Sequence, residues 1–219
     1  MDLTKAIESR FSSRSYSSKS FPVSVISQIL ELAIKCPNAG NLHSYRFVVI
    51  DEEDLKIKVA KASMNQLWMA EAPYLIVVCY DDTSLKRYYE DQGHHYGEQD
   101  AVVVSSYITL VAKEFDLDTC FVSAFEPEEI SRLTRLPGNV HPEVIIPIGY
   151  TREKKKFQYR PSIDLLGFYN EYGNKSFRKT LEEKAKELPK SAKSDLKSKV
   201  QKINLDKVKG FFKKKKPWN

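Results

Sequence analysis

Several features that often decide the class of a protein are scarce or absent in this sequence of 219 residues. No apolar run reaches the roughly 18 residues that a membrane-spanning helix needs. The first ten residues, MDLTKAIESR, lack the hydrophobic core of a secretory signal, so we expect a cytoplasmic protein. The three cysteines, Cys36, Cys79 and Cys120, are isolated and odd in number, which favours reduced thiols over a disulfide framework.

Signatures of several kinds of chemistry are also missing. The sequence shows no catalytic triad, no paired-carboxylate site, no activated nucleophile and no Gly-rich dinucleotide fingerprint. His94 and His95, with Asp91 and Glu98 nearby, could suggest a metal site. Neighbouring histidines point apart on a helix or a strand, however, and no third ligand stands at a standard spacing. We therefore expect no metal site and assign no catalytic side chain.

The net charge of +6 is unevenly distributed along the chain. Residues 176–219 carry 15 Lys and Arg against 5 Asp and Glu, whereas residues 1–175 carry 20 against 24. The sequence therefore predicts a mildly acidic domain at 1–175 and a strongly basic tail at 176–219. The first part of the tail is compatible with one helix, and the lysine-rich remainder has the composition of a flexible extension.

Hydrophobic periodicity predicts alternating helices and strands in residues 1–175. Apolar residues at helical spacing predict a short helix from Leu3 and a second helix that ends before Pro37. Strands are predicted at 47–50, 74–79, 119–122 and 144–149, and further helices at 51–62 and from Glu126. Residues 101–115 predict a helix that is buried on most sides. Residues 81–99 predict an irregular polar segment, whose tyrosines could line a substrate entrance or a subunit contact.

Two polar stretches have the composition of binding segments. Residues 36–47, CPNAGNLHSYRF, place Asn38 and Asn41 around a glycine, and their amides can hold a flat heterocycle or a phosphate. Arg10 and Arg14 are four residues apart with serines between them, a plausible clamp for a phosphate or carboxylate. Taken singly, the first stretch is equally compatible with a helix stop and a turn, and the second with a solvated surface segment.

In this order along the chain, these stretches resemble the nitroreductase family of flavin mononucleotide (FMN) enzymes. That family has an Arg-x-Ser-x-Arg motif at the end of a first helix, here at residues 10–14, and a Pro-x-Ala-Gly-Asn-type loop, here at residues 37–41. The resemblance continues through NQLWMAEAPYLIVV, QDAVVVSSYITLVAKEFDLDTCFVSAF and VIIPIGY and covers about residues 3–165. It implies an α+β fold, a three-layer α-β-α sandwich around a central, mostly antiparallel sheet, and a homodimer with FMN near the subunit interface.

The resemblance also implies a set of cofactor-binding residues. An amide at position 65 or 66 would bond the pyrimidine edge of the flavin, backbone N–H groups near 123–124 would approach its N5 atom, and a basic residue before a proline would return to its phosphate. Two positions depart from the family: Trp68 stands where some relatives have Lys, and Ala124 where many have Gly. The implied residues are Arg10, Ser12, Arg14, Pro37, Asn38, Ala39, Asn41, Asn65, Gln66, Ser123, Ala124, Gly149 and Arg160.

The function that the resemblance implies is an FMN-dependent oxidoreductase with a ping-pong mechanism. NADH or NADPH would deliver hydride as a transient substrate, and an electron-poor acceptor such as a nitroaromatic or a quinone would then take the electrons. A flavin reductase or a flavin-dependent dehalogenase on the same scaffold would keep the same phosphate contacts. The alternative of another class is a non-enzymatic binding protein whose basic tail contacts nucleic acid or an anionic membrane.

Overall fold

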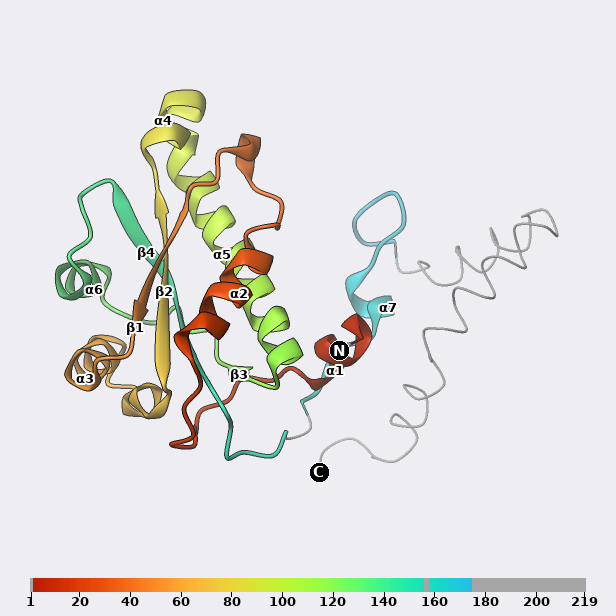
Figure 1. Cartoon of the computed structure of the whole chain (residues 1–219). Coiled ribbons are helices and arrows are strands. Elements are labelled where there is room, and N and C mark those ends of the chain that lie inside the picture. Colours follow the sequence, from red (N-terminus) through yellow and green to blue (C-terminus); the bar gives the residue numbers. More distant parts are fainter. Residues whose placement is uncertain (1, 156–157, 175–219) are drawn as a thin grey trace, which may run out of the picture. The chain divides into compact units, whose positions relative to one another are not determined.

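A four-stranded sheet lies between two layers of helices (Figure 1). Its strands are β1 (Tyr45–Ile50), β2 (Tyr74–Asp81), β3 (Asp118–Thr119) and β4 (Val140–Gly149), in the order β1-β2-β4-β3. Every pairing between these strands is antiparallel, and the longest runs from Tyr74 opposite Ile148 to Asp81 opposite Val140. The predicted mostly antiparallel sheet is confirmed, with strand β3 shorter than the sequence indicates.

The computed structural model describes residues 2–155 and 158–174. Its contacts divide the chain into two units, residues 1–156 and 157–219, and each unit is described by itself. The predicted basic tail at 176–219 lies outside the described residues. In the described part of the chain, no helix has both the length and the apolar composition needed to cross a membrane.

Helices cover both faces of the sheet, as the sandwich architecture requires. Helices α2 (Val23–Ala33) and α5 (Gly93–Val111) pack on one face, and helices α3 (Glu53–Ala62) and α6 (Pro127–Thr134) on the other (Figure 1). Strand β2 contributes to both cores because its alternate side chains point to opposite faces. The three-layer α-β-α sandwich predicted from the family resemblance is confirmed.

The remaining helices are short. Helix α1 (Leu3–Ser9) begins after Asp2, whose carboxylate caps it by accepting the N–H of Thr4, and α4 (Thr83–Tyr89) follows strand β2. The second unit contains α7 (Ile163–Leu166), where the Ser162 hydroxyl accepts the N–H of Asp164. The 3-10 turns are η1 (Ala39–Asn41), η2 (Leu67–Glu71), η3 (Glu90–Gln92) and η4 (Ala112–Phe115).

The central helix is longer than the sequence suggests. Residues 81–99 are not irregular: they form α4, η3 and the first turns of α5, which begins at Gly93. Two glycines allow this packing, because a side chain on Gly93 would meet the backbone of Leu85 and Lys86, and one on Gly97 would meet the ring of Tyr80. The polar composition of this segment therefore reflects its position at the edge of the molecule and not a lack of helical structure.

Replacing Gly97 tests this packing. A Gly97→Ala substitution ordinarily favours a helix by about 1 kcal/mol, but here the new methyl group would overlap the ring of Tyr80, which is buried and cannot move away. We expect the free energy of unfolding, measured with urea, to fall by about 1–3 kcal/mol. The matched control is Gly138→Ala, where the new methyl group would meet nothing within 4 Å. An unchanged or increased stability of the Gly97→Ala variant would contradict the tight packing of α5 on β2.

Candidate functional site

The segment after helix α1 is attached along the edge of the sheet. Ser12 forms a parallel bridge with Thr119 of β3, and Tyr16 forms an antiparallel bridge with Thr151, just beyond β4. The Ser13 hydroxyl lies 2.7 Å from that of Thr151, and the Ser13 N–H donates to the Thr119 carbonyl at 3.0 Å. Residues 12–16 are thus held by hydrogen bonds to two strands.

The buried side chain of Tyr16 anchors residues 12–16 to strand β4. Its side chain is fully buried, and its hydroxyl shares one proton between the carbonyl oxygens of Ser13 and Pro147, at 3.0 and 3.2 Å. Burial raises the pKa of this hydroxyl well above its usual value, so it stays a neutral donor. Since Ser13 and Tyr16 point inward, the arginines on either side of Ser13 are left at the surface.

Arg10, Ser12 and Arg14 gather around the buried thiol of Cys120. Burial raises the pKa of that thiol, whereas the charges of Arg14 and Arg10 and a hydrogen bond with Ser12 act in the opposite direction. The guanidinium carbon of Arg14 also lies 5.9 Å from the centre of the Trp68 ring. We call Arg10, Ser12, Arg14, Trp68 and Cys120 the arginine cluster.

The two guanidinium groups of the arginine cluster have no anionic partner in the part of the chain that the structure describes. The nearby carboxylate of Glu153 accepts the backbone N–H of Arg14, at 3.1 Å. Two adjacent cations without a carboxylate favour an external anion, and planar guanidinium groups suit a phosphate because they can donate two hydrogen bonds at once. The cluster therefore has the chemistry of a phosphate site.

An amide-bearing turn lies beside the segment that follows β3. Helix α3 is followed by Met64 and Asn65, both in the left-handed region, with φ of 53° and 57°. Asparagine tolerates this conformation well, and methionine does so rarely. The turn brings the side-chain amide of Gln66 to the carbonyl of Ala124, a long hydrogen bond of 3.4 Å, and the Glu126 N–H donates to the Ala62 carbonyl at 2.9 Å.

Residues 123–124 present backbone donors at the surface next to this amide. Both Ser123 and Ala124 are exposed. The neighbouring N–H groups of Val122 and Glu126 are bonded to Ile145 and Ala62, whereas those of Ser123 and Ala124 donate to no acceptor among the described residues. Among the described residues, the N–H groups of Ser123 and Ala124 without an acceptor and the amide of Gln66 thus lie side by side, on the segment that follows Cys120 of the arginine cluster.

The second predicted binding segment, residues 37–41, lies elsewhere in the chain. Its Ala39 N–H donates to the buried carboxylate of Asp100 on α5, at 2.8 Å, and the other oxygen of Asp100 accepts the Ser44 hydroxyl at 2.7 Å. The Asn38 side chain closes the loop by accepting the His43 N–H at 3.0 Å. Asn38 is thus engaged within its own loop, while Asn41 is exposed, with φ of 57°.

One chain does not bring these two segments together. The loop joins β1 at the end of the sheet where Tyr45 pairs with Tyr80, and the arginine cluster lies at the opposite end, where Ile148 pairs with Tyr74 and Thr119. Six residues of strand β2 separate these ends, a distance of about 20 Å. The loop at 37–41 and the segment at 10–14 therefore lie at opposite ends of the sheet (Figure 1).

Two further predicted residues have other surroundings. A side chain on Gly149 would come 2.6 Å from the Pro73 ring and 3.2 Å from that of Tyr16, so close packing by itself requires glycine at this position. Arg160 belongs to the second unit, where its guanidinium donates to the Gln158 side chain at 2.8 Å and to the Tyr159 carbonyl at 3.3 Å. Their assignment to a cofactor site stays a prediction.

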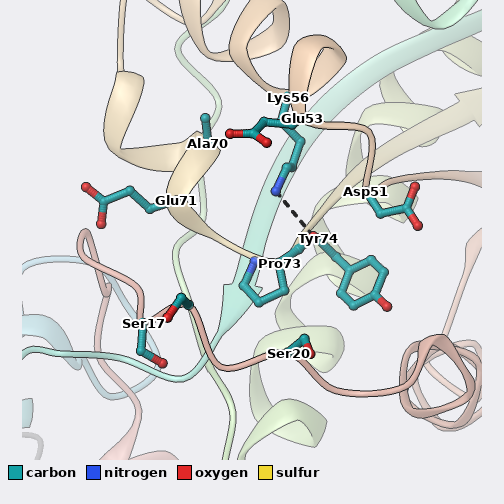
Figure 2. A pocket seen from close by; sticks show the side chains of 10 residues that line it. Ser17, Ser20, Asp51, Glu53, Lys56, Ala70, Glu71, Pro73 and Tyr74 are labelled. Atoms are coloured by element: carbon teal, nitrogen blue, oxygen red, sulfur yellow. Dashed lines mark hydrogen bonds between the residues drawn. The ribbon is translucent and has the colours of Figure 1, made fainter.

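A hollow of about 420 Å³ lies apart from both groups (Figure 2). At its centre the Lys56 ammonium donates to the Ala72 carbonyl at 2.8 Å, and burial lowers the pKa of this lysine. This hydrogen bond uses the charge to tie α3 to the start of β2. None of the predicted site residues lines the hollow, which is formed by Ser17, Ser18, Ser20, Asp51, Glu53, Lys56, Ala70, Glu71, Pro73 and Tyr74.

The fold and the site define an α-β-α sandwich protein with two arginines at one end of its sheet that have no anionic partner among the described residues. A profile of the nitroreductase family matches residues 7–68 and 62–150, more than half of the chain. The chain therefore belongs to the nitroreductase family.

Individual relatives agree with this assignment. A protein provisionally named NADH dehydrogenase/NAD(P)H nitroreductase, from Methanothermobacter thermautotrophicus, is 29% identical over 157 residues, which are 70% of this chain and 79% of the relative. An iodotyrosine dehalogenase 1 homolog of Caenorhabditis elegans is 23% identical over 66% of this chain and 53% of its own length. A provisionally assigned nitroreductase of Exiguobacterium sibiricum, solved in complex with FMN, has the same fold, with a TM-score of 0.72 and 20% identity over 78% of this chain and 98% of its own.

Two members of the arginine cluster escaped the sequence analysis as site residues. Trp68 was noted only as a departure from the family, and Cys120 only as an isolated thiol. The spacing of Arg14 and Trp68 along the chain gives no sign of their contact, because it depends on how the turn after α3 folds back. The position of Cys120 in the predicted strand at 119–122, just before the predicted site residues 123–124, was the one available signal.

The contact between Arg14 and Trp68 makes anion binding measurable without any cofactor. We expect inorganic phosphate to change the tryptophan emission of the protein, because an anion at the guanidinium alters its cation–π contact with the ring. Arg14→Ala should weaken phosphate binding about 10- to 100-fold, since a charged hydrogen bond contributes about 1.5–3 kcal/mol.

Two control variants make this measurement specific. Trp68→Phe should abolish the signal and show that it does not come from Trp218. Lys19→Ala removes a cation that lies over the Tyr150 ring, 4.0 Å from its centre, and should leave the affinity unchanged. Equal phosphate affinity in the wild type and the Arg14→Ala variant would rule out the cluster as an anion site.

Proposed function

We propose that this protein is an FMN-dependent oxidoreductase that takes hydride from NADH or NADPH and passes the electrons to an electron-poor acceptor. The observation that carries the proposal is the pair of guanidinium groups of Arg10 and Arg14 beside Cys120, which have no anionic partner among the described residues. The backbone donors of Ser123 and Ala124, on the segment after Cys120, likewise have no acceptor in the described part of the chain. The names of two relatives, an NAD(P)H nitroreductase and a protein solved with FMN, support the same cofactor and donor.

The residues of the arginine cluster fit the parts of FMN. Arg10 and Arg14 would hold the phosphate through charged hydrogen bonds, with the Ser12 hydroxyl as a third donor. The amide of Asn65 or Gln66 offers a donor and an acceptor to the pyrimidine edge, and the hydrogen bond of the Gln66 side chain to Ala124 is long, at 3.4 Å. The N–H groups of Ser123 and Ala124 would face the reactive edge of the ring system. The family resemblance assigns Arg160 to the phosphate as well, and this assignment stays a prediction.

The chemistry of hydride uptake and release would be supplied by the bound flavin. The chain's own part is binding, orientation and exclusion of water. Cys120 is 2% exposed and lies beside the arginines. Burial raises the pKa of its thiol, so the thiol stays neutral and contributes packing to the site but no charge. Donor and acceptor would use the same surface in turn, which gives ping-pong kinetics.

The visible spectrum of the purified protein is the direct test. We expect flavin absorption bands that bleach when NADH or NADPH is added without oxygen. Arg10→Gln combined with Arg14→Gln should lose most of the flavin, because the two changes remove both phosphate cations. A folded wild-type protein that is colourless and takes up no added FMN would overturn the proposed function.

A second candidate reaction is reductive dehalogenation, which the C. elegans relative's name suggests. The arginine cluster would serve both reactions equally, so the distinction depends on the acceptor. After reduction without oxygen, reoxidation by a nitroaromatic or a quinone would support the first proposal. Reoxidation by a halogenated phenol with release of halide, and not by the other acceptors, would support dehalogenation.

We further propose that a complete flavin site needs two copies of the chain. In one chain the loop at 37–41 and the arginine cluster lie at opposite ends of the sheet, whereas the family resemblance assigns both to one cofactor. Apolar side chains stay exposed on α1 and α5 and next to Cys120, as expected of a surface that a second copy covers. They are Leu3, Ile7, Val102, Tyr107 and Phe121, between 37% and 66% exposed.

Mixing two defective variants tests the shared site. Arg10→Gln/Arg14→Gln removes the phosphate cations, and Asn41→Gly removes the loop amide at a position where glycine tolerates the positive φ. Each variant alone should bind little FMN. When both are refolded together, about half of the dimers are mixed and each contains one intact site, so flavin binding should recover to about a quarter of the wild-type level.

The refolded mixture has two informative outcomes. Recovery of flavin binding requires that residues from two chains meet in one site. If the mixture binds no more FMN than the two variants do separately while light scattering shows dimers, each site is built within one chain and the shared-site proposal is wrong.

A further inference from the structure

Three potential metal ligands converge at the end of the sheet that lies away from the arginine cluster. In the described residues, Asp82, His94 and His141 are the group whose ligand atoms all lie within 4.8 Å of one another. The Nε2 atom of His141 lies 2.8 Å from Oδ2 of Asp82, and Nδ1 of His94 lies 3.8 Å from the same oxygen. A four-coordinate ion with bonds of about 2.0–2.1 Å needs ligand atoms roughly 3.3 Å apart, which is between these two distances.

Each ligand comes from a different, well-anchored element. Asp82 joins β2 to α4, and its backbone N–H donates to the Asn139 carbonyl at 3.0 Å. His94 is in the first turn of α5, which Gly93 allows to pack directly on the backbone of α4. His141 is the second residue of β4 and pairs with Tyr80 of β2. These attachments hold the three side chains close before any ion binds, which lowers the entropic cost of binding one.

The cluster is accessible from one side. The side chain of Asp82 is only 4% exposed, whereas those of His94 and His141 are 49% and 31% exposed. The two imidazole rings meet edge to face, with their centres 4.6 Å apart. A buried carboxylate with two partly exposed imidazoles leaves room for a water molecule as the fourth ligand.

Two groups compete with an ion for these atoms. The Lys86 ammonium lies 2.6 Å from Oδ2 of Asp82, and the Tyr80 hydroxyl lies 3.1 Å from Nδ1 of His94. The Lys86 side chain is 57% exposed and can move into solvent. A divalent ion at the carboxylate would repel this ammonium, so Lys86 lowers the affinity of the site for the ion.

We propose that Asp82, His94 and His141 bind a divalent transition-metal ion of the zinc class. Two imidazole nitrogens select Zn²⁺, Co²⁺ or Ni²⁺ over Mg²⁺ and Ca²⁺, which prefer oxygen ligands. The bound ion cross-links the ends of β2 and β4 to the first turn of α5. This site contains no residue of the arginine cluster, so it stands independently of the flavin proposal.

The sequence pointed to a different set of residues. In the sequence, His94 stands near His95, Asp91 and Glu98, and none of these is at the spacing of a standard metal-binding motif. In the structure, His95 instead bonds the Gln99 side chain, at 2.8 Å, and the partners of His94 come from 12 residues before it and 47 residues after it. The expectation that there is no metal site was based on local spacing, which cannot detect ligands from three elements.

Titration of the full, untagged chain with Zn²⁺ tests the proposal. After treatment with a chelator, calorimetry should show one Zn²⁺ bound per chain and a rise in the unfolding temperature, because the ion binds the folded state. Co²⁺ should give the visible absorption of a four-coordinate ion with nitrogen ligands. Mg²⁺ should have neither effect.

Four variants define the ligands. His94→Gln and His141→Gln should each weaken Zn²⁺ binding at least about tenfold, and Lys86→Gln should strengthen it by removing the competing cation. His95→Gln, on an exposed neighbour outside the cluster, is the matched control and should bind as the wild type does.

Other results would overturn the proposal. Absence of Zn²⁺ binding by the wild type and by Lys86→Gln would leave only a hydrogen-bonded cluster. Binding that survives both His94→Gln and His141→Gln would place the ion elsewhere. Because all readouts concern the ion and the folded chain, they stay valid even if the protein contains no flavin.

Discussion

The burial of strand β2 on both faces is the constraint on which the rest of the structure depends. Leu75, Val77 and Cys79 point into the core under α3 and α6, while Ile76 and Val78 point into the core under α2 and α5, and all five are fully buried. Such a strand requires helices on both sides of the sheet. Polar chemistry is then excluded from the faces of the sheet and confined to its two ends, where the arginine cluster and the loop at 37–41 lie.

A few buried polar groups hold these two ends in place. Asp100 accepts hydrogen bonds from both Ala39 and Ser44 and so fixes the loop on α5. Lys113 and Asp118 form a buried ion pair of 2.8 Å where α5 gives way to β3, directly before Cys120. Removing one partner of such a pair leaves a buried charge uncompensated, which costs far more than a surface pair contributes. The sites are therefore positioned by the core and not by their own side chains.

The sequence predicted what depends on local pattern and missed what depends on contact between distant segments. Apolar spacing identified α2 and the burial of α5. The helix predicted from Glu126 is confirmed as α6, with Glu126 as its N-cap. The beginning of α5 was missed because Gly93 and Gly97 lower helix propensity. The structure shows that these glycines allow α5 to pack closely on α4 and on Tyr80. The grouping of Arg14, Trp68 and Cys120 could not be predicted either, because these residues are far apart in the sequence and meet only in the folded chain.

Helix α5 connects the two ends of the sheet physically. Its 19 residues extend about 28 Å, with His94 in its first turn, Asp100 under the loop and Lys113 just beyond its end. A metal ion at His94 would therefore act on the same rigid element that carries the loop. Coupling between two sites requires an element with two arrangements of similar free energy. The close packing of Gly93 and Gly97 leaves α5 no room to shift toward α4 or β2, so the direct consequence of metal binding is stability at this end of the sheet and not a change at the arginine cluster.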